Sequence, residues 1–109
     1  MPWVTLDRGE QLEEIVQRSN LRPQLIFKHS SSCGISRMVL NMFNNSFDPQ
    51  WDCDLHFLTI QANRGLSNDV ASRFGVRHES PQLLILRDGK VSFHTSHGAI
   101  SDTDIKAYL

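Results

Sequence analysis

The sequence predicts an α/β fold, in which the strands of a central sheet alternate with helices. Two continuous apolar runs, Leu25-Ile26-Phe27 and Leu83-Leu84-Ile85-Leu86, are typical of strands covered on both faces. Alternating strands and helices require right-handed crossovers, so we expect a largely parallel sheet flanked by helices. The strongest helix signal is a set of apolar residues at helical spacing, which are Ile35, Met38, Val39, Met42 and Phe43.

The first half of the chain predicts two helices around one strand. Asp7, followed three residues later by Glu10, has the pattern of a capping box, and the apolar spacing that follows predicts a helix to about Ser19. After the first buried strand, Ser30-Ser31-Ser32 provides N-cap side chains for the second helix. The polar segment over residues 44–49 ends that helix.

The second half predicts the remaining strands and helices. A strand over Leu55–Ile60 precedes a helix over about Ser67–Phe74, and Gly75 suits the left-handed position after a helix. Asp88-Gly89 is a hairpin signal that makes the last strand antiparallel. Ser101, with an aspartate three residues later, starts the final helix. The expected order is α-β-α-β-α-β-β-α, with a four-stranded mixed sheet.

Length and composition limit the class of protein. A chain of 109 residues is a usual size for one hydrophobic core, so we expect a single domain over residues 1–109. The net charge of -1 provides no field that would attract nucleic acid. The N-terminal residues lack the apolar stretch of a signal peptide, and no apolar run is long enough to span a membrane. We therefore expect a cytoplasmic protein with reduced thiols that binds neither nucleic acid nor a membrane, while the oligomeric state stays open.

Cys33 is the candidate nucleophile because it lies where a buried strand meets a helix. A thiol at that position faces free backbone N–H groups and the positive end of the helix dipole, and both favour the thiolate. Ser36 lies over the same turn and could hydrogen-bond the sulfur, and Arg37 adds positive charge nearby. His29 could add further charge if it is protonated. The alternative is that Cys33 is only a small apolar core residue.

The second cysteine, Cys53, is not expected to form a disulfide with Cys33. The predicted helix between them extends about 20 Å, at 1.5 Å per residue, and carries the chain to the other edge of the sheet. A disulfide requires Cα atoms within about 7 Å. Cys53 is therefore interpreted as a structural or free surface thiol, and Cys33 as acting without an internal partner.

Other chemistries lack their motifs in this sequence. A phosphatase loop requires an arginine six residues after the cysteine, where this chain has Val39. Neither a Cys-x-x-Cys pair nor a helical His-x-x-x-His pair is present, so we expect no metal site and no cofactor. The five histidines are interpreted as scattered surface residues: His29, His56, His78, His94 and His97.

From Ser32 to Leu109 the chain resembles thioredoxins, with Cys33 at the position of their first cysteine. The similar stretches are Phe74–Arg77, Ser80–Leu86, Asp88–Val91 and Gly98-Ala99. The resemblance implies that Pro81 is a cis-proline facing Cys33, that the backbone of Ser80 holds the substrate as a short strand, and that Gly98 leaves room for it. The loop from Gly75 to Pro81 is one residue longer than in common thioredoxins.

A narrower resemblance covers nearly the whole chain. Ser32-Cys33-Gly34-Ile35-Ser36, His78-Glu79-Ser80-Pro81-Gln82 and His94-Thr95-Ser96-His97 resemble the YtxJ family of monothiol bacilliredoxins in the bacillithiol system. Members commonly carry Thr-Cys-Pro-Ile-Ser, and this chain has serine and glycine at the first and third positions. The resemblance implies that Cys33, with Ser36 and Arg37, removes bacillithiol from protein mixed disulfides, which contact Ser32 and Gly34. Bacillithiol would be a thiol co-substrate, and bacillithiolated proteins would be the partners.

Two alternatives belong to other functional classes. Cys33-Gly34-Ile35-Ser36 differs by one residue from the Cys-Gly-Phe-Ser of monothiol glutaredoxins, which bind a glutathione-ligated [2Fe-2S] cluster between two subunits. Against this, the expected Thr-Val-Pro is Glu79-Ser80-Pro81 here. The other alternative is a non-catalytic thioredoxin-like module, in which the groove at Pro81 binds a protein partner and Cys33 is incidental.

Overall fold

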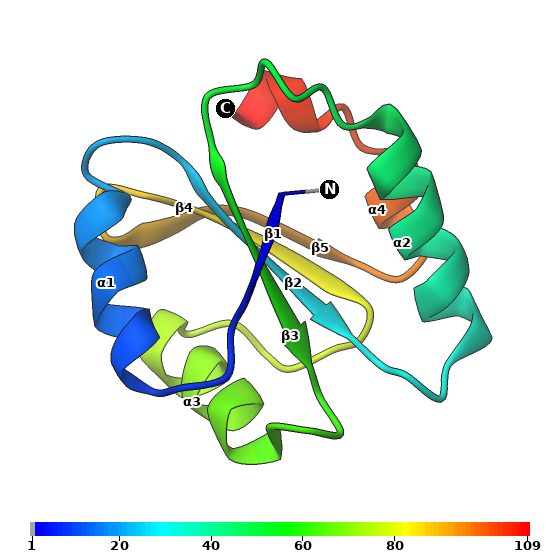
Figure 1. Cartoon of the computed structure of the whole chain (residues 1–109), viewed down its shortest axis with the longest axis horizontal. Helices are drawn as coiled ribbons and strands as arrows, with labels where there is room; N and C mark the ends of the chain where they lie inside the picture. Colours follow the sequence, from blue (N-terminus) through cyan, green and yellow to red (C-terminus); the bar gives the residue numbers. More distant parts are fainter. Residues whose placement is uncertain (1) are drawn as a thin grey trace.

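The computed structural model describes residues 2–109 and shows a mixed five-stranded sheet between two pairs of helices (Figure 1). The strand order is β1-β3-β2-β4-β5, with β1, β2 and β3 parallel and β4 and β5 antiparallel to their neighbours. The elements are β1 Trp3–Thr5, α1 Glu10–Arg18, β2 Gln24–His29, α2 Gly34–Ser46, β3 Asp54–Thr59, α3 Arg64–Phe74, β4 Gln82–Arg87, β5 Lys90–Ser96, α4 Ala99–Asp102 and a final 3-10 helix, Ile105–Tyr108.

The sheet has five strands instead of the predicted four, because β1 precedes the first predicted helix. β1 pairs in parallel with β3, with Trp3 opposite Leu55 and Thr5 opposite Phe57. A strand of three residues is too short to show alternation, so the pattern carries no signal for it. The other predicted strands are present, and every residue of β2 is buried, as expected for a central strand.

The two faces of the sheet carry separate cores. On one face, Leu25 and Phe27 of β2 pack with Val39 and Phe43 of α2 and with Ile100 of α4. On the other face, Ile26 and Leu84 pack with α1 and α3, through residues that include Leu12, Ile15, Leu66 and Val70. Figure 1 shows the same division, with α1 and α3 on one side of the sheet and α2 and α4 on the other. No helix within residues 2–109 has both the length and the apolar character needed to cross a membrane.

The predicted capping box at the start of α1 is wrong. The N-cap residue is Gly9, and no side chain caps the helix. Instead, the side-chain oxygen of Gln11 accepts the backbone N–H groups of Asp7 and Arg8, both at 2.8 Å. Its amide nitrogen donates to the carbonyl of Thr5 at 2.9 Å. Gln11 therefore satisfies the backbone groups of the turn between β1 and α1, including the N–H of Asp7 that Glu10 would accept in a capping box.

The helix α2 has the expected length, but its apolar stripe is only partly buried. Val39 and Phe43 lie in the core, whereas Ile35, Met38 and Met42 are exposed. The N-cap is Cys33 rather than one of the preceding serines, and no side chain makes a cap hydrogen bond there. The five apolar positions thus cover a wider arc of the helix than the sheet covers.

The C-terminal half follows the prediction until the last helix. Gly75 ends α3 with φ 66°, and the hairpin turn has φ 54° at Asp88 and φ 78° at Gly89, all as expected. The helix α3 starts at Arg64, three residues earlier than predicted. The predicted final helix from Ser101 is instead divided into α4 and the 3-10 helix.

Candidate active site

Three loops meet at the edge of the sheet where β2 ends. Lys28, next to the end of β2, pairs with Gln82 at the start of β4. Ser80 and Pro81 come directly before Gln82, so they lie at this edge. Gln82 in turn pairs with Ser96 at the end of β5, so the following loop arrives there as well. The register therefore brings Cys33, which follows β2, to the same edge as the loop before β4 and the loop after β5.

Cys33 is partly exposed and forms the N-cap of α2, with φ −106° and ψ 118°. Its backbone N–H donates to the carbonyl of Ser30 at 3.3 Å, and its carbonyl accepts the N–H of Arg37 at 3.2 Å. The side chain of an N-cap residue lies beside the free N–H groups of the first helical turn and the positive end of the helix dipole. Cys33 therefore lies at the end of α2 that carries the positive partial charge of the helix dipole.

Ser36 is fully buried, and its hydroxyl joins the first turn of α2 to the end of β2. The hydroxyl oxygen lies 2.8 Å from Nδ1 of His29 and accepts the backbone N–H of Ser30 at 3.1 Å. A hydrogen bond from Ser36 to the sulfur, which the spacing suggested, is not among those made by the described residues. Ser36 instead holds the turn that carries Cys33.

His29 and His56 are buried, so the prediction that all five histidines lie at the surface is wrong for these two. Burial and the nearby Arg37 guanidinium lower the pKa of His29 below its usual value. The imidazole is therefore neutral at pH 7 and adds no positive charge beside Cys33. Its ring packs at a centroid distance of 5.3 Å from that of Phe57.

Gln61 is a residue of this site that the sequence did not reveal. Its amide nitrogen donates to the hydroxyls of Ser30 at 2.8 Å and Ser32 at 3.1 Å, and its oxygen accepts the N–H of Ser31 at 3.0 Å. Arg37 braces the same loop from α2, by donating to the carbonyl of Ser31 at 3.2 Å. Gln61 comes just after β3, and the parallel strands β3 and β2 end at the same edge, which is the one signal that could have identified it.

The loops before β4 and after β5 lie at the same edge of the sheet as Cys33. The bond between Ser80 and Pro81 is cis, as expected. The carbonyl of Pro81 accepts the N–H of His97 at 2.9 Å, which joins the loop before β4 to the loop after β5. Gly98 borders open space, because a Cβ atom added to it would meet no atom within 4 Å. Gly34, at the start of α2, is exposed. A Cβ atom added to it would lie 3.8 Å from a guanidinium nitrogen of Arg37.

Glu79 is the charged residue closest to Pro81 in the chain. It accepts a hydrogen bond from the hydroxyl of Ser96, and this bond lowers the pKa of its carboxyl. Nε2 of His97 lies 4.0 Å from the same carboxylate. A carboxylate and a histidine therefore lie in loops that reach the same edge of the sheet as Cys33.

Cys53 lies at the opposite edge of the sheet from Cys33. It precedes Asp54, which pairs with Gln24 at the start of β2, whereas Cys33 follows the end of β2. Both cysteines are free thiols. Cys53 is buried, and burial raises the pKa of its thiol to about 11. The interpretation of Cys53 as a surface thiol is therefore wrong, and the structural interpretation agrees with its position.

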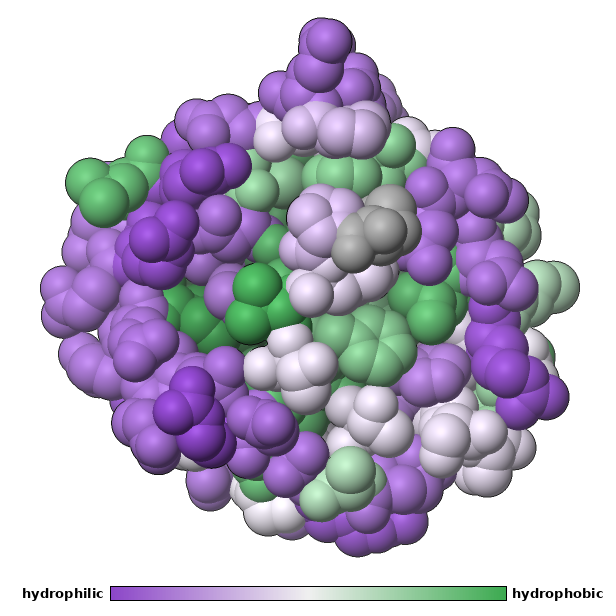
Figure 2. Space-filling model, viewed as in Figure 1, coloured by the Kyte–Doolittle hydropathy of each residue, from purple (hydrophilic) through white to green (hydrophobic). Residues whose placement is uncertain are grey.

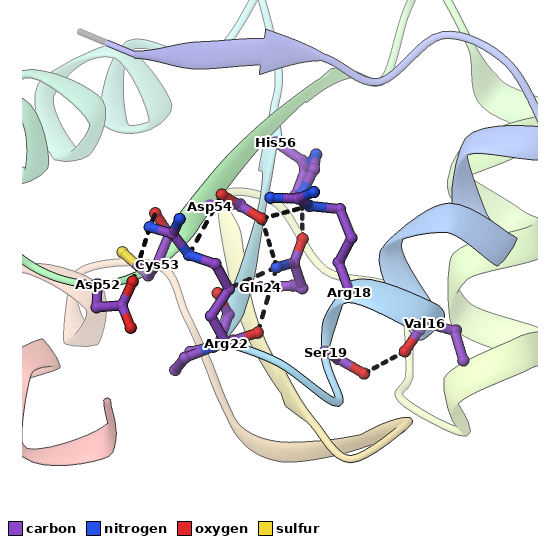
Figure 3. A network of polar contacts seen from close by, with 10 residues as sticks. Val16, Arg18, Ser19, Arg22, Gln24, Asp52, Cys53, Asp54 and His56 are labelled. Carbon is purple, nitrogen blue, oxygen red and sulfur yellow. Dashed lines mark hydrogen bonds and ion pairs between the residues drawn. The ribbon is translucent and has the colours of Figure 1, made fainter.

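A polar network surrounds Cys53 at that edge (Figure 3). Arg18 donates to the carboxylate of Asp54 at 2.7 Å, and Arg22 donates to the carbonyl of Cys53 at 3.0 Å. Gln24 lies between Asp54 and His56 and hydrogen-bonds both side chains. A cavity of about 470 Å³ lies between α1 and the start of β3, and Figure 2 shows recessed hydrophobic atoms within a hydrophilic rim on this face. Cys53 lines this cavity, so the cavity is separate from the site at Cys33.

Metal ligands do not gather anywhere within the described part of the chain. No three histidine, cysteine, aspartate or glutamate side chains of residues 2–109 lie close enough together to hold a metal ion. The arrangement at Cys33 is instead that of a single, partly exposed thiol at a helix N-terminus.

Solved structures similar to this chain share its fold. One, described as a candidate oxidoreductase with a thioredoxin fold, has a TM-score of 0.83 at 26% identity and covers 99% of this chain and 95% of its own. A thioredoxin of Nicotiana alata has a TM-score of 0.74 at 17% identity, with coverage of 98% and 90%. A thioredoxin variant of Halobacterium salinarum has a TM-score of 0.72 at 18% identity, with coverage of 98% and 87%.

Sequence comparison identifies a more specific relationship. The family model described as Monothiol bacilliredoxin BrxC matches residues 4–105, which include Cys33, Ser36, Pro81 and Gly98. The family and the fold together support thiol–disulfide exchange as the general chemistry of the chain. The chain therefore belongs to the monothiol bacilliredoxin BrxC family and has the thioredoxin fold.

Proposed function

We propose that the protein removes bacillithiol from protein mixed disulfides through Cys33. The observation that carries this proposal is the location of Cys33, a partly exposed N-cap thiol whose only companion cysteine is buried at the opposite edge of the sheet. The residue three positions later is Ser36, so no disulfide can form across this turn. A lone thiol of this kind exchanges mixed disulfides and cannot reduce a protein disulfide by forming its own.

The reaction is a thiol–disulfide exchange without net oxidation. The Cys33 thiolate attacks the bacillithiol sulfur of the modified protein, a bond forms between these two sulfurs, and the bond from bacillithiol to the protein breaks. The protein sulfur leaves as a thiolate and takes a proton from water. A second bacillithiol, or the thiol of another protein, then attacks the bacillithiol sulfur on Cys33 and restores the free thiolate. Bacillithiol is thus a co-substrate, and no cofactor takes part.

The loops around Cys33 give roles to the other site residues. The backbone of Ser80, beside Pro81, pairs with the substrate chain as a short added strand, and the open space at Gly98 admits that chain. Ser32 and Gly34 are exposed on either side of Cys33 and contact the bacillithiol moiety. Arg37 holds the loop through Ser31 and stabilises the developing negative charge on sulfur. Free thiols suit a reducing compartment, so we place the protein in the cytoplasm.

Intact-mass spectrometry tests this proposal. Serum albumin that carries bacillithiol on its free thiol is mixed with an excess of the protein, and the mass of bacillithiol is expected on Cys33 while albumin loses it. Cys33→Ser should leave the albumin modified. Cys53→Ser is the matched control and should react like the unmodified sequence. Transfer to Cys53, or no transfer at all, would refute the proposal.

A further inference from the structure

Lys28 is a buried lysine without a carboxylate partner. It lies in the central strand β2, and its side chain is among the fully buried ones. Its ammonium nitrogen lies 3.0 Å from the carbonyl of Ser67 and 3.2 Å from Nδ1 of His78. No acidic side chain within residues 2–109 forms an ion pair with it. A buried charge of this kind costs stability unless its hydrogen bonds offset the lost hydration.

The partners of Lys28 belong to the segment that leads from α3 to Pro81. Ser67 lies in α3, and its hydroxyl oxygen is also 3.2 Å from Nδ1 of His78. The next attachment is at Arg77, whose carbonyl accepts the side-chain N–H of Gln82 at 2.9 Å. Two successive residues of this loop are therefore fastened to the buried ends of β2 and β4. This is the loop that is one residue longer than in common thioredoxins.

We propose that Lys28 is a positioning residue, which anchors His78 and thereby holds the loop ending at Ser80 and Pro81 in the geometry that receives a protein substrate beside Cys33. The inference rests on the proposed function and adds a determinant of protein-substrate binding to it. Lys28 is buried beneath the loop, so it acts on the substrate only through His78. A small disulfide that reaches Cys33 without pairing with the loop should not depend on Lys28.

The proton on His78 decides whether the anchor holds. An ammonium group only donates hydrogen bonds, so Nδ1 of His78 must be an unprotonated acceptor. Partial loss of solvent around its ring, together with Lys28 and Arg64 of α3, lowers the pKa of His78, and Glu79 opposes this shift. From β4, Gln82 faces the cluster and does not titrate. At neutral pH the hydrogen bond between Lys28 and His78 is intact. When His78 is protonated at lower pH, its Nδ1–H and the Lys28 ammonium group are both donors, so this hydrogen bond is lost and the loop is released.

The test compares two substrates with the full chain. Rate constants are measured for bacillithiolated serum albumin, by intact mass after acid quenching, and for dithiodipyridine, by the absorbance of the released thiopyridone. Lys28→Met should slow the albumin reaction about tenfold, the effect of one lost charge-assisted hydrogen bond, and leave the dithiodipyridine reaction within about twofold. Lys90→Met, at the exposed hairpin, is the matched control and should change neither rate.

The two His78 variants separate anchoring from general damage to the fold. His78→Asn places an amide oxygen near the position of Nδ1, so it should keep the albumin rate. His78→Leu removes the acceptor and should behave like Lys28→Met. If Lys28→Met does not fold, this pair of variants alone decides the matter, because His78 is exposed and its replacement leaves the core intact.

The pH profile provides a readout that a purely structural role would not change. The ratio of the two rate constants cancels the ionisation of Cys33, because both reactions use the same thiolate. In the unmodified sequence this ratio should fall as the pH is lowered below about 6.5, the usual value for histidine, and in His78→Asn it should stay constant.

Each outcome has one interpretation. If the albumin rate of Lys28→Met is unchanged, or if both substrates slow equally, the positioning role is wrong and the proposed function stands. If the unmodified sequence reacts with dithiodipyridine and not with bacillithiolated albumin, the proposed function itself is wrong.

Discussion

Ser36 and His29 share a buried hydrogen bond of 2.8 Å that ties the first turn of α2 to the last residue of β2. The same hydroxyl accepts the N–H of Ser30 at 3.1 Å, so one oxygen closes the turn on which Cys33 sits. In a dithiol protein this position would hold the resolving cysteine. In this chain Ser36 occupies the position and supports the turn that carries Cys33.

Ser36→Ala should destabilise the fold, because it leaves the N–H of Ser30 and Nδ1 of His29 buried without a partner. Leaving a buried polar group unpaired costs about 1–3 kcal/mol. Urea unfolding at pH 7 should show a loss of this size in the free energy of unfolding. Ser72→Ala, at an exposed position of α3, is the control and should change the stability little. Equal stability of the two variants would contradict the role assigned to Ser36.

Alkylation should separate the two cysteines. Cys53 is buried and its thiol pKa is raised to about 11, so it is neither accessible nor ionised at pH 8. Iodoacetamide should modify Cys33 in the folded protein and reach Cys53 only after denaturant is added, as peptide mass mapping would show. Cys33→Ser should take up no label while folded. Labelling of Cys53 at a rate similar to that of Cys33 would show that the start of β3 opens readily.

The sequence predicted the parts of the fold that depend on local pattern. Gly75 and Asp88-Gly89 adopt the expected backbone because their conformations are decided within a few residues. The capping box at Asp7 is absent because Gln11 accepts the N–H of Asp7, which the Glu10 side chain would accept in a capping box, together with the N–H of Arg8. The strand β1 was missed because its three residues are held by pairing with β3, which is distant in the chain.

The residues of the candidate site differ in the same way, because local sequence predicts some of them and long-range packing determines the others. The position of Cys33 follows from one strand-to-helix junction, and that of Pro81 from a resemblance carried by neighbouring residues. The contacts of Ser36, Gln61 and Lys28 could not be predicted, because each partner is fixed by the packing of separate elements. Burial of Ser36 in place of Ile35 depends on the angle at which α2 meets the sheet, which helical spacing does not specify.

His56 should make the protein sensitive to mild acid. Burial lowers the pKa of its imidazole from 6.5 to about 4, so between these values the unfolded chain binds a proton that the native state does not. The free energy of unfolding should therefore fall as the pH is lowered from 6.5 to 4, by about 3 kcal/mol from this residue. His29 and His78, whose pKa values are also lowered, add to the same trend.

The variant His56→Gln isolates that contribution. Its amide can still donate to the side-chain oxygen of Gln24, which His56 now contacts at 2.8 Å, and it does not titrate. Urea unfolding at pH 7 and pH 4.5 should show a smaller loss in the variant than in the unmodified sequence. Parallel losses would mean that His56 does not control the acid response.

Lys28→Met should stabilise the protein at neutral pH while it impairs exchange with protein substrates. Burial lowers the pKa of Lys28 from 10.5 to about 8, so between these values the unfolded chain again binds more protons than the native state. The resulting cost, about 3 kcal/mol, is fully present below pH 8 and is relieved as the pH rises toward 10.5. Methionine has a similar volume and no charge to bury, so it avoids this cost.

The stability difference between Lys28→Met and the unmodified sequence should therefore be largest near pH 7.5 and shrink by pH 10, as measured by urea unfolding at both values. Titrations elsewhere in the chain are common to both proteins and cancel in this difference. A variant less stable than the unmodified sequence at pH 7.5 would show that the hydrogen bonds to Ser67 and His78 outweigh the burial of the charge. Lys28 would then stabilise the fold, and its contact with His78 would carry no cost in stability.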